Sequence, residues 1–267
     1  VTLPLAPAVI DAMQKAVAEM GVKETFRGYG PEQGYDFLHE AIVKYYAGFG
    51  VTLASDEIFI SDGAKSDCGN ITDIFSNANT ILIPDPVYPV YLDTNIMCGR
   101  KIVYMDGKPE NNFLPMPDDS VKADIIYLCS PNNPTGNVFP AIEIERLITA
   151  FDGIVVVDEA YIDFSSRPSW IRRLNEFHNL VVLQTFSKAW GSAGVRLGMA
   201  FASPDIIGYY NQVKYPYNIS ALVQRYAMEM LDRENEVRRW VDEILSVRSR
   251  FVERLSGIPM VKTVYPS

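Results

Sequence analysis

Short, mostly uniformly apolar segments alternate with amphipathic segments along the whole chain, and this alternation constrains the fold more than any other feature. Strands are predicted at 57–60, 80–83, 101–105, 124–129, 153–157, 180–184 and 196–202. Helices are predicted at 7–20, 35–47, 67–76, 88–98, 141–150 and 221–255, the last with a bend or break near 232–234. Because strands buried on both faces are typical of parallel sheets between layers of helices, the sequence predicts a layered α/β fold.

Composition and charge argue against several classes of protein. The formal net charge of −9 argues against nucleic acid as the main partner, and the apolar segments are too short to span a membrane as helices. Three scattered cysteines without CxxC spacing indicate neither a disulfide framework nor a zinc site. The two histidines are expected on surfaces or loops, so we expect chemistry that runs without a metal ion.

The two ends of the chain carry separate expectations. No signal-like segment begins the chain, which favours a cytoplasmic location. Residues 1–4 begin inside an apparent structural element, and the chain stops abruptly at 264–267. We therefore expect both ends to be truncated.

A lysine follows directly after one of the buried strands. Ser187 and Lys188 come after the apolar run 181–184, and Arg196 lies eight residues further on in a glycine-rich turn. Burial and a nearby cation both favour the neutral form of an amine, which is the nucleophile for carbonyl carbon. The alternative is a lysine that extends its amine to solvent.

An acidic residue ends the most apolar strand. Asp158 follows three consecutive valines, and a buried carboxylate at that point needs a cationic partner. The pyridinium nitrogen of a cofactor would serve, because an acid beside it keeps the nitrogen protonated. Tyr161 can direct its phenol at the same ligand. The alternative is an ion pair within the core.

Two loops offer further groups for a ligand. Asn133, in the Asn-Pro-Thr-Gly loop at 133–136, has an amide that could bind a phenolate oxygen. The segment 63–66 opens a helix after a strand, where backbone N–H groups bind phosphate. Tyr88 can stack on an aromatic ligand. A turn, a helix cap and a core aromatic are the respective alternatives.

Together these groups suit a phosphate, a pyridinium, a phenolate and an aldehyde, which specifies pyridoxal 5′-phosphate. The ordered set of the 133–136 loop, Asp158 with Tyr161, Ser187-Lys188 and Arg196 resembles the class I/II aminotransferases of fold-type I. The resemblance implies a three-layer α/β/α large domain with a mixed, mostly parallel sheet of seven strands. It implies a partial N-terminal arm and interface loop at 1–34, the large domain at 35–230, and the start of a small domain at 231–267.

The resemblance also implies a role for each site residue. Lys188, Asp158 and Tyr161 are the implied catalytic residues. Lys188 binds the aldehyde and later moves a proton, Asp158 pairs with the ring nitrogen, and Tyr161 binds the ring oxygen with Asn133. Tyr88 stacks on the ring. The implied phosphate-binding groups are the backbone of Ala64 and Lys65, Ser187 and Arg196, with Thr185 as a further candidate.

Two residues are implied to act across a homodimer with shared active sites. Tyr29 reaches the phosphate bound by the neighbouring subunit. Glu32 binds the distal ammonium of a substrate there, and the alternative for Glu32 is a cap of the following helix. The substrates implied are small molecules, an amino acid and a 2-oxo acid such as 2-oxoglutarate.

The resemblance divides along the chain. The stretches 24–35, 61–67 and 85–91 resemble LL-diaminopimelate aminotransferases, whereas 157–164 and 185–191 resemble histidinol-phosphate aminotransferases. We therefore expect a natural mosaic or an engineered chimera in which 1–130 and 137–267 differ in kind. LL-diaminopimelate of lysine biosynthesis is the first predicted substrate, and histidinol phosphate of histidine biosynthesis is the alternative. A second alternative is a non-catalytic cofactor-binding scaffold, because the family's carboxylate-binding arginine lies beyond the C-terminal end of this chain.

Overall fold

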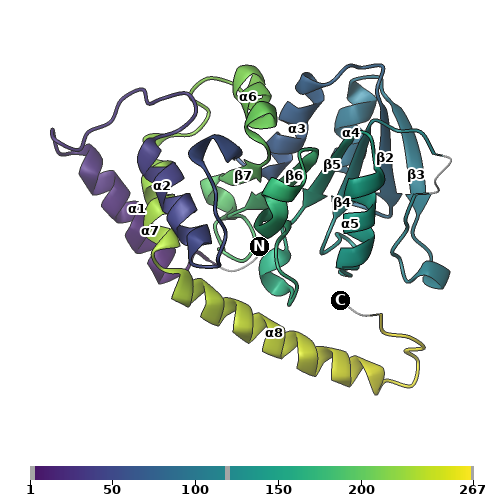
Figure 1. The fold of residues 1–267 in the computed structure, drawn as a ribbon. Helices are drawn as coiled ribbons and strands as arrows, with labels where there is room; N and C mark the ends of the chain where they lie inside the picture. Colours follow the sequence, from purple (N-terminus) through teal and green to yellow (C-terminus); the bar gives the residue numbers. More distant parts are fainter. Residues whose placement is uncertain (1–3, 118–120, 266–267) are drawn as a thin grey trace.

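The central sheet has seven strands in the computed structural model, which describes residues 4–117 and 121–265. The strand order is β1-β7-β6-β5-β4-β2-β3, and β7 runs antiparallel to both neighbours while the other pairs are parallel (Figure 1). The strands are β1 (Ile58–Ser61), β2 (Thr80–Asp85), β3 (Lys101–Asp106), β4 (Ile125–Cys129), β5 (Ile154–Asp158), β6 (Leu180–Thr185) and β7 (Gly198–Phe201). The predicted mixed, mostly parallel sheet is confirmed.

Helices cover both faces of this sheet. One face carries α1 (Pro7–Met20), α2 (Asp36–Ala47), α5 (Ala141–Ala150) and α7 (Ala221–Leu231). The other face carries α3 (Ala64–Ile74), α4 (Val90–Met97) and α6 (Pro204–Val213). The long helix α8 (Glu234–Ser256) runs beneath this body (Figure 1). Among the described helices, none combines the length and apolar character that a bilayer span requires.

The strands are buried on both faces, as their composition predicts. In β5, Val155 and Val157 belong to the core under α2, α5 and α7, whereas Val156 belongs to the core under α3, α4 and α6. All three side chains have no exposed surface. Because successive residues of a strand point to opposite faces, a strand between two helix layers needs apolar residues at every position.

Element boundaries differ from the prediction by no more than three residues, with physical reasons in two places. Strand β2 continues through Pro84 to Asp85 instead of stopping at Ile83. Its pairing with β4 covers only Ile81 and Leu82, so the missing N–H of the proline costs no bond to β4. Strand β7 begins at Gly198 rather than at 196, because Arg196 has a left-handed backbone with φ of 61°.

Three further predictions about helices and the residues on them can be compared with the structure. The break predicted near 232–234 is confirmed, since α7 ends at Leu231 and α8 begins at Glu234. Helix α6 was not predicted, although the start signal Ser203-Pro204-Asp205 precedes it. The expectation for the histidines is wrong for His39, which is buried on α2 with its ring nitrogens at the carbonyl oxygens of Ser55 and Gln33.

Candidate active site

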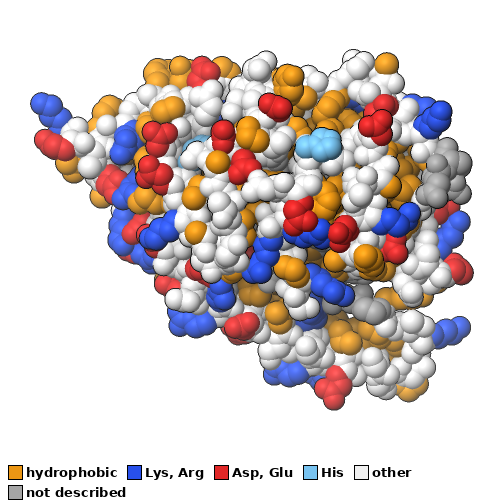
Figure 2. Space-filling view, in the orientation of Figure 1, with side chains coloured by type: hydrophobic (Ala, Val, Ile, Leu, Met, Phe, Trp, Pro, Cys, Tyr) orange, Lys and Arg blue, Asp and Glu red, His pale blue; other side chains and the backbone are white. Residues whose placement is uncertain are grey.

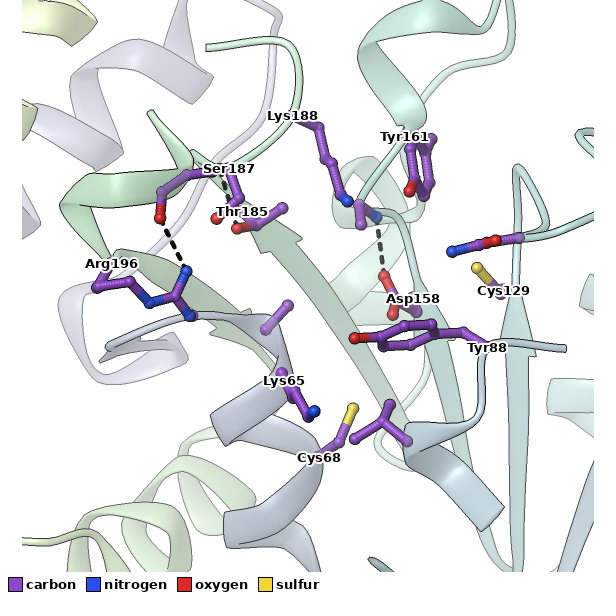
Figure 3. Close-up of a pocket in the computed structure, with 16 residues that line it drawn as sticks. Lys65, Cys68, Tyr88, Cys129, Asp158, Tyr161, Thr185, Ser187, Lys188 and Arg196 are labelled. Carbon is purple, nitrogen blue, oxygen red and sulfur yellow. Dashed lines mark hydrogen bonds between the residues drawn. The ribbon is translucent and has the colours of Figure 1, made fainter. Parts of the chain in front are cut away.

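A cavity of about 280 Å³ lies where β4, β5 and β6 end. Carboxyl ends of parallel strands meet at one edge of a sheet, so residues far apart in sequence converge there. Figure 3 shows the side chains that point into it. The lining residues are Gly63, Ala64, Lys65, Cys68, Tyr88, Val90, Cys129, Asn133, Asp158, Ala160, Tyr161, Thr185, Ser187, Lys188, Ala193 and Arg196.

Lys188 reaches into this cavity from the turn after β6. Its Nζ lies 4.9 Å from the centre of the Tyr161 ring, and the side chain extends toward Asp158 (Figure 3). The lysine is exposed rather than enclosed, so its amine is accessible to a ligand. Lys65 is the other lysine that lines the cavity, and it belongs to the first turn of α3.

Asp158 is held at the end of β5 by two hydrogen bonds. The Ala160 N–H donates to Oδ1 at 2.9 Å, and the Tyr91 hydroxyl donates to Oδ2. Burial raises the pKa of the Asp158 carboxyl, while these bonds and the charge of Lys188 act in the opposite direction. A carboxylate in this position is stabilised by a cationic ligand, as a pyridinium nitrogen would provide.

Tyr91 is a positioning residue that the sequence did not reveal. It lies on α4, is fully buried, and stacks on the Tyr127 ring with centroids 5.1 Å apart. Its hydroxyl fixes the orientation of the Asp158 carboxylate. The nearest sequence signal is its spacing from Tyr88 by one helical turn, which does not by itself identify an acid as its partner.

The start of α3 and the turn before β7, which carries Arg196, form a corner whose groups suit an anion. Gly63 has φ of 138°, and a Cβ added there would lie 2.7 Å from Nη2 of Arg196. A Cβ on Gly198 would lie 2.5 Å from the backbone nitrogen of Ala64. Glycine at both positions therefore lets the guanidinium and the first turn of α3 approach each other. Within residues 4–117 and 121–265 the N–H groups of Ala64 and Lys65 have no acceptor, whereas those of Ser66 and Asp67 donate to the Gly63 carbonyl, so the first two are available for an anion.

This set of groups fits pyridoxal 5′-phosphate. The corner of α3 and Arg196 suits the phosphate, Asp158 suits the ring nitrogen, and Lys188 suits the aldehyde. Asn133 and Tyr161 line the same cavity and could donate hydrogen bonds to a ring oxygen, and Figure 3 shows the Tyr88 ring extending into it. Ser187 and Thr185 are also present, joined by a 3.1 Å bond from the Ser187 N–H to the Thr185 hydroxyl.

Tyr29 and Glu32 are not brought to this cavity. They line another cavity of about 250 Å³ together with Arg27, Lys214 and Tyr217. The Tyr29 ring is 90% exposed and lies 4.9 Å from the Tyr217 ring. Within one chain these two residues therefore line a different cavity from Lys188. Glu32 does not cap α2 in the part of the chain that the structure describes: the N-cap residue is Tyr35, its N–H donates to Gln224 Oε1, and the N–H groups of Leu38 and His39 donate to the Tyr35 carbonyl.

A family model described as aminotransferase class I and II matches residues 2–266. The chain belongs to the class I and II aminotransferase family. Within this family, whose members use pyridoxal phosphate, the chain is 46% identical over 225 residues to an LL-diaminopimelate aminotransferase of Parabacteroides distasonis. That match covers 77% of the chain and 54% of the relative, so the chain spans about half the length of the curated relatives it matches.

Solved structures of the family agree with this fold. The L,L-diaminopimelate aminotransferase of Chlamydomonas reinhardtii gives a TM-score of 0.78 at 32% identity, over 90% of this chain and 66% of that chain. The histidinol-phosphate aminotransferase of Clostridium acetobutylicum gives 0.83 at 20% identity, over 99% and 77%, and this likeness shows the fold alone. The match to the diaminopimelate enzyme of Parabacteroides distasonis covers 77% of the chain, which is more residues than the segment 1–130 contains. The similarity to diaminopimelate enzymes therefore continues past residue 130.

Glu159, the neighbour of Asp158, faces the opposite core. Its carboxylate accepts hydrogen bonds from the Trp170 N–H at 2.8 Å, the Ser169 hydroxyl at 2.5 Å and the Gln184 amide at 2.9 Å. Burial raises the pKa of the Glu159 carboxyl to about 7, although these hydrogen bonds act in the opposite direction. The two adjacent acids therefore serve different parts of the molecule.

We expect the pKa of Glu159 to make stability depend on pH. Between its ordinary pKa of 4.5 and about 7, the unfolded chain ionises this group while the folded chain retains the proton. The free energy of unfolding therefore falls as pH rises through that window, by a contribution on the order of 3 kcal/mol. Glu159→Gln should remove this contribution, as measured by urea unfolding from pH 4.5 to 7.5. The exposed Glu253→Gln serves as control, and an unchanged slope in Glu159→Gln would contradict the assignment.

Proposed function

We propose that the chain binds pyridoxal 5′-phosphate and moves an amino group between an amino acid and a 2-oxo acid. The observation that carries this proposal is the convergence of Lys188, Asp158 and Arg196 on one cavity. When bound, the cofactor supplies an aldehyde and an electron sink for carbanion chemistry. Lys188 holds the aldehyde and moves the proton at its Nζ. Asp158 keeps the proton on the ring nitrogen.

The remaining cavity residues bind and orient the cofactor in this proposal. Arg196, Ser187 and the N–H groups of Ala64 and Lys65 hold the phosphate, with Thr185 supporting Ser187 through its hydroxyl. Asn133 and Tyr161 bind the ring oxygen, and Tyr88 stacks on the ring. The same proposal includes a cytoplasmic location and three parts of the chain: an N-terminal arm and interface loop at 1–34, the large domain at 35–230 and the start of a small domain at 231–267. Residues 1–3 of the first part and 266–267 of the last lie outside the described residues.

LL-diaminopimelate is the proposed amino donor. The similarity to curated proteins of that name supports it, at 44–46% identity over 225–227 residues. An assay with cofactor, 2-oxoglutarate and either LL-diaminopimelate or histidinol phosphate tests it, with glutamate formation and cofactor loading measured together. Glutamate formed only with histidinol phosphate would favour the alternative substrate. Full cofactor loading without glutamate from either donor would favour the non-catalytic scaffold.

We expect Glu32→Gln to weaken the preference for LL-diaminopimelate over histidinol phosphate. A carboxylate attracts the distal ammonium of the first donor and repels the phosphate of the second. The ratio of the two kcat/KM values should fall about tenfold, which corresponds to about 1.4 kcal/mol. Cofactor binding should not change. Glu24→Gln, which alters an exposed acid of the same region, is the control. An unaltered ratio in Glu32→Gln would remove the assigned role.

We expect the chain to form homodimers in which Tyr29 serves the partner's cavity. A Tyr29→Phe chain should bind the cofactor weakly, although Tyr29 lies outside the cavity of its own chain. Mixed dimers of Tyr29→Phe and Lys188→Ala should contain one intact site. Reductive labelling at limiting cofactor should therefore recover in the mixture, with dimers verified by sedimentation. Verified mixed dimers without recovery would show that the sites are not shared.

A further inference from the structure

A neighbouring cavity of about 380 Å³ adjoins the proposed cofactor cavity. The two cavities share Asn133 and Tyr161 as lining residues, so they lie on either side of the same two side chains. The loops after β4 and β5 and one residue of α8 form its walls. The lining residues are Pro131, Asn132, Asn133, Pro134, Gly136, Val138, Tyr161, Phe164, Ser165, Ser166 and Arg248.

Arg248 is the only charged residue among those lining residues. No carboxylate lines the cavity, and no hydrogen bond or ion pair of Arg248 occurs within residues 4–117 and 121–265. Ser165, Ser166 and Asn133 add neutral hydrogen-bonding groups. A guanidinium among neutral polar groups favours an anionic ligand, because its planar donors match the oxygens of a carboxylate or phosphate.

The periodicity of α8 explains why Arg248 faces the body of the protein. Val237 and Val241 are buried in the core, and Leu245 packs against it. Residues spaced by three, four or seven share one face of a helix, so Arg248 continues the face of Val241 and Leu245. The helix contacts the short segment Ile162–Phe164 next to Tyr161, which brings this face to the cavity.

We propose that this cavity is an anion subsite of the active site and that Arg248 binds the anionic end group of the amino donor or acceptor. The proposal rests on the proposed function, because it extends the cofactor cavity past Asn133 and Tyr161. The chemistry it recognises is an oxyanion, which is a carboxylate in diaminopimelate or 2-oxoglutarate and a phosphate in histidinol phosphate. Arg248 thus acts as a specificity-determining residue on a helix.

Direct binding of two probes tests this subsite. The chain is first loaded with pyridoxal 5′-phosphate, whose phosphate occupies the corner formed by the start of α3 and Arg196. It is then titrated with glutarate or inorganic phosphate in a calorimeter. We expect Arg248→Gln to weaken binding of the preferred anion at least about tenfold, as loss of a charge-assisted contact implies. Arg248→Lys should restore only part of the affinity. Arg250→Gln is the matched control, because Arg250 is exposed on the same helix and lines neither cavity.

Each outcome decides a separate point. Tighter binding of glutarate that depends on Arg248 supports a carboxylate subsite, and tighter binding of phosphate that depends on Arg248 supports the subsite with a phosphate end group. Equal affinities in Arg248→Gln and the parent chain, or no binding of either probe, would overturn the proposal. Reductive labelling of Lys188 in the same samples tests the proposed function independently. Arg248 is exposed, so its variants should keep the parent unfolding curve.

Discussion

Lys188→Ala is expected to abolish covalent attachment of pyridoxal 5′-phosphate to the chain. Lys188 Nζ is directed into the cavity beside Tyr161, and this amine is the group that would hold the aldehyde of the cofactor. Borohydride reduction of the loaded parent chain, followed by peptide mapping, should place the label on the peptide that contains Lys188. The variant should give no label at this position, a complete loss rather than a partial one.

The variant should still bind the cofactor without a covalent bond. Arg196 and the free N–H groups at the start of α3 remain in place, and they supply the attraction for the phosphate. Lys65→Ala is the matched control, since it removes the other lysine of the cavity and should leave the label unchanged. A label on Lys65 in the parent chain would show that the wrong lysine has been assigned.

Asp158→Asn is expected to slow removal of the substrate α-proton at least about a hundredfold, or about 2.7 kcal/mol on the barrier. An amide has no charge to keep the ring nitrogen protonated, so the ring withdraws electrons less strongly. Exchange of the α-hydrogen of the amino donor in deuterium oxide, followed by NMR, measures this step without an acceptor. Labelling of Lys188 should persist in the variant.

Two comparisons separate this role of Asp158 from a structural one. Asp163→Asn alters a nearby acid that does not line the cofactor cavity and should leave exchange unchanged. Tyr91→Phe removes the hydroxyl that orients Asp158 and should give an intermediate loss, because the charge remains. Exchange by Asp158→Asn within about threefold of the parent, or about 0.7 kcal/mol, would exclude the role.

The positions of Lys188 and Asp158 were predictable because each lies at or shortly after the carboxyl end of a mostly apolar strand. Such strands are parallel and buried, and their carboxyl ends meet at one edge, so residues at these ends reach a common cavity. The contact between Tyr91 and Asp158 was not predictable. It joins residues 67 positions apart, and it depends on how α4 packs over the sheet, for which the sequence holds no local pattern.

The proposed role of Arg248 could not be predicted from the sequence either. The apolar spacing of α8 is visible in the chain, and it assigns Arg248 to the inward face. The direction in which the helix leaves α7, however, is set by the break at Asp232 and Arg233. That direction decides whether the inward face meets a cavity or solvent, and tertiary packing fixes it.

The two adjacent acids at the end of β5 make the length of that strand critical. Asp158 points to the cofactor cavity and Glu159 to the opposite core, so insertion of one residue within β5 would turn Asp158 toward that core. Val157 would then occupy the position that faces the cavity, and the cavity would lose its carboxylate. Insertions and deletions in this family member should therefore be tolerated in the surface loops but not within β5, however conservative the inserted residue is.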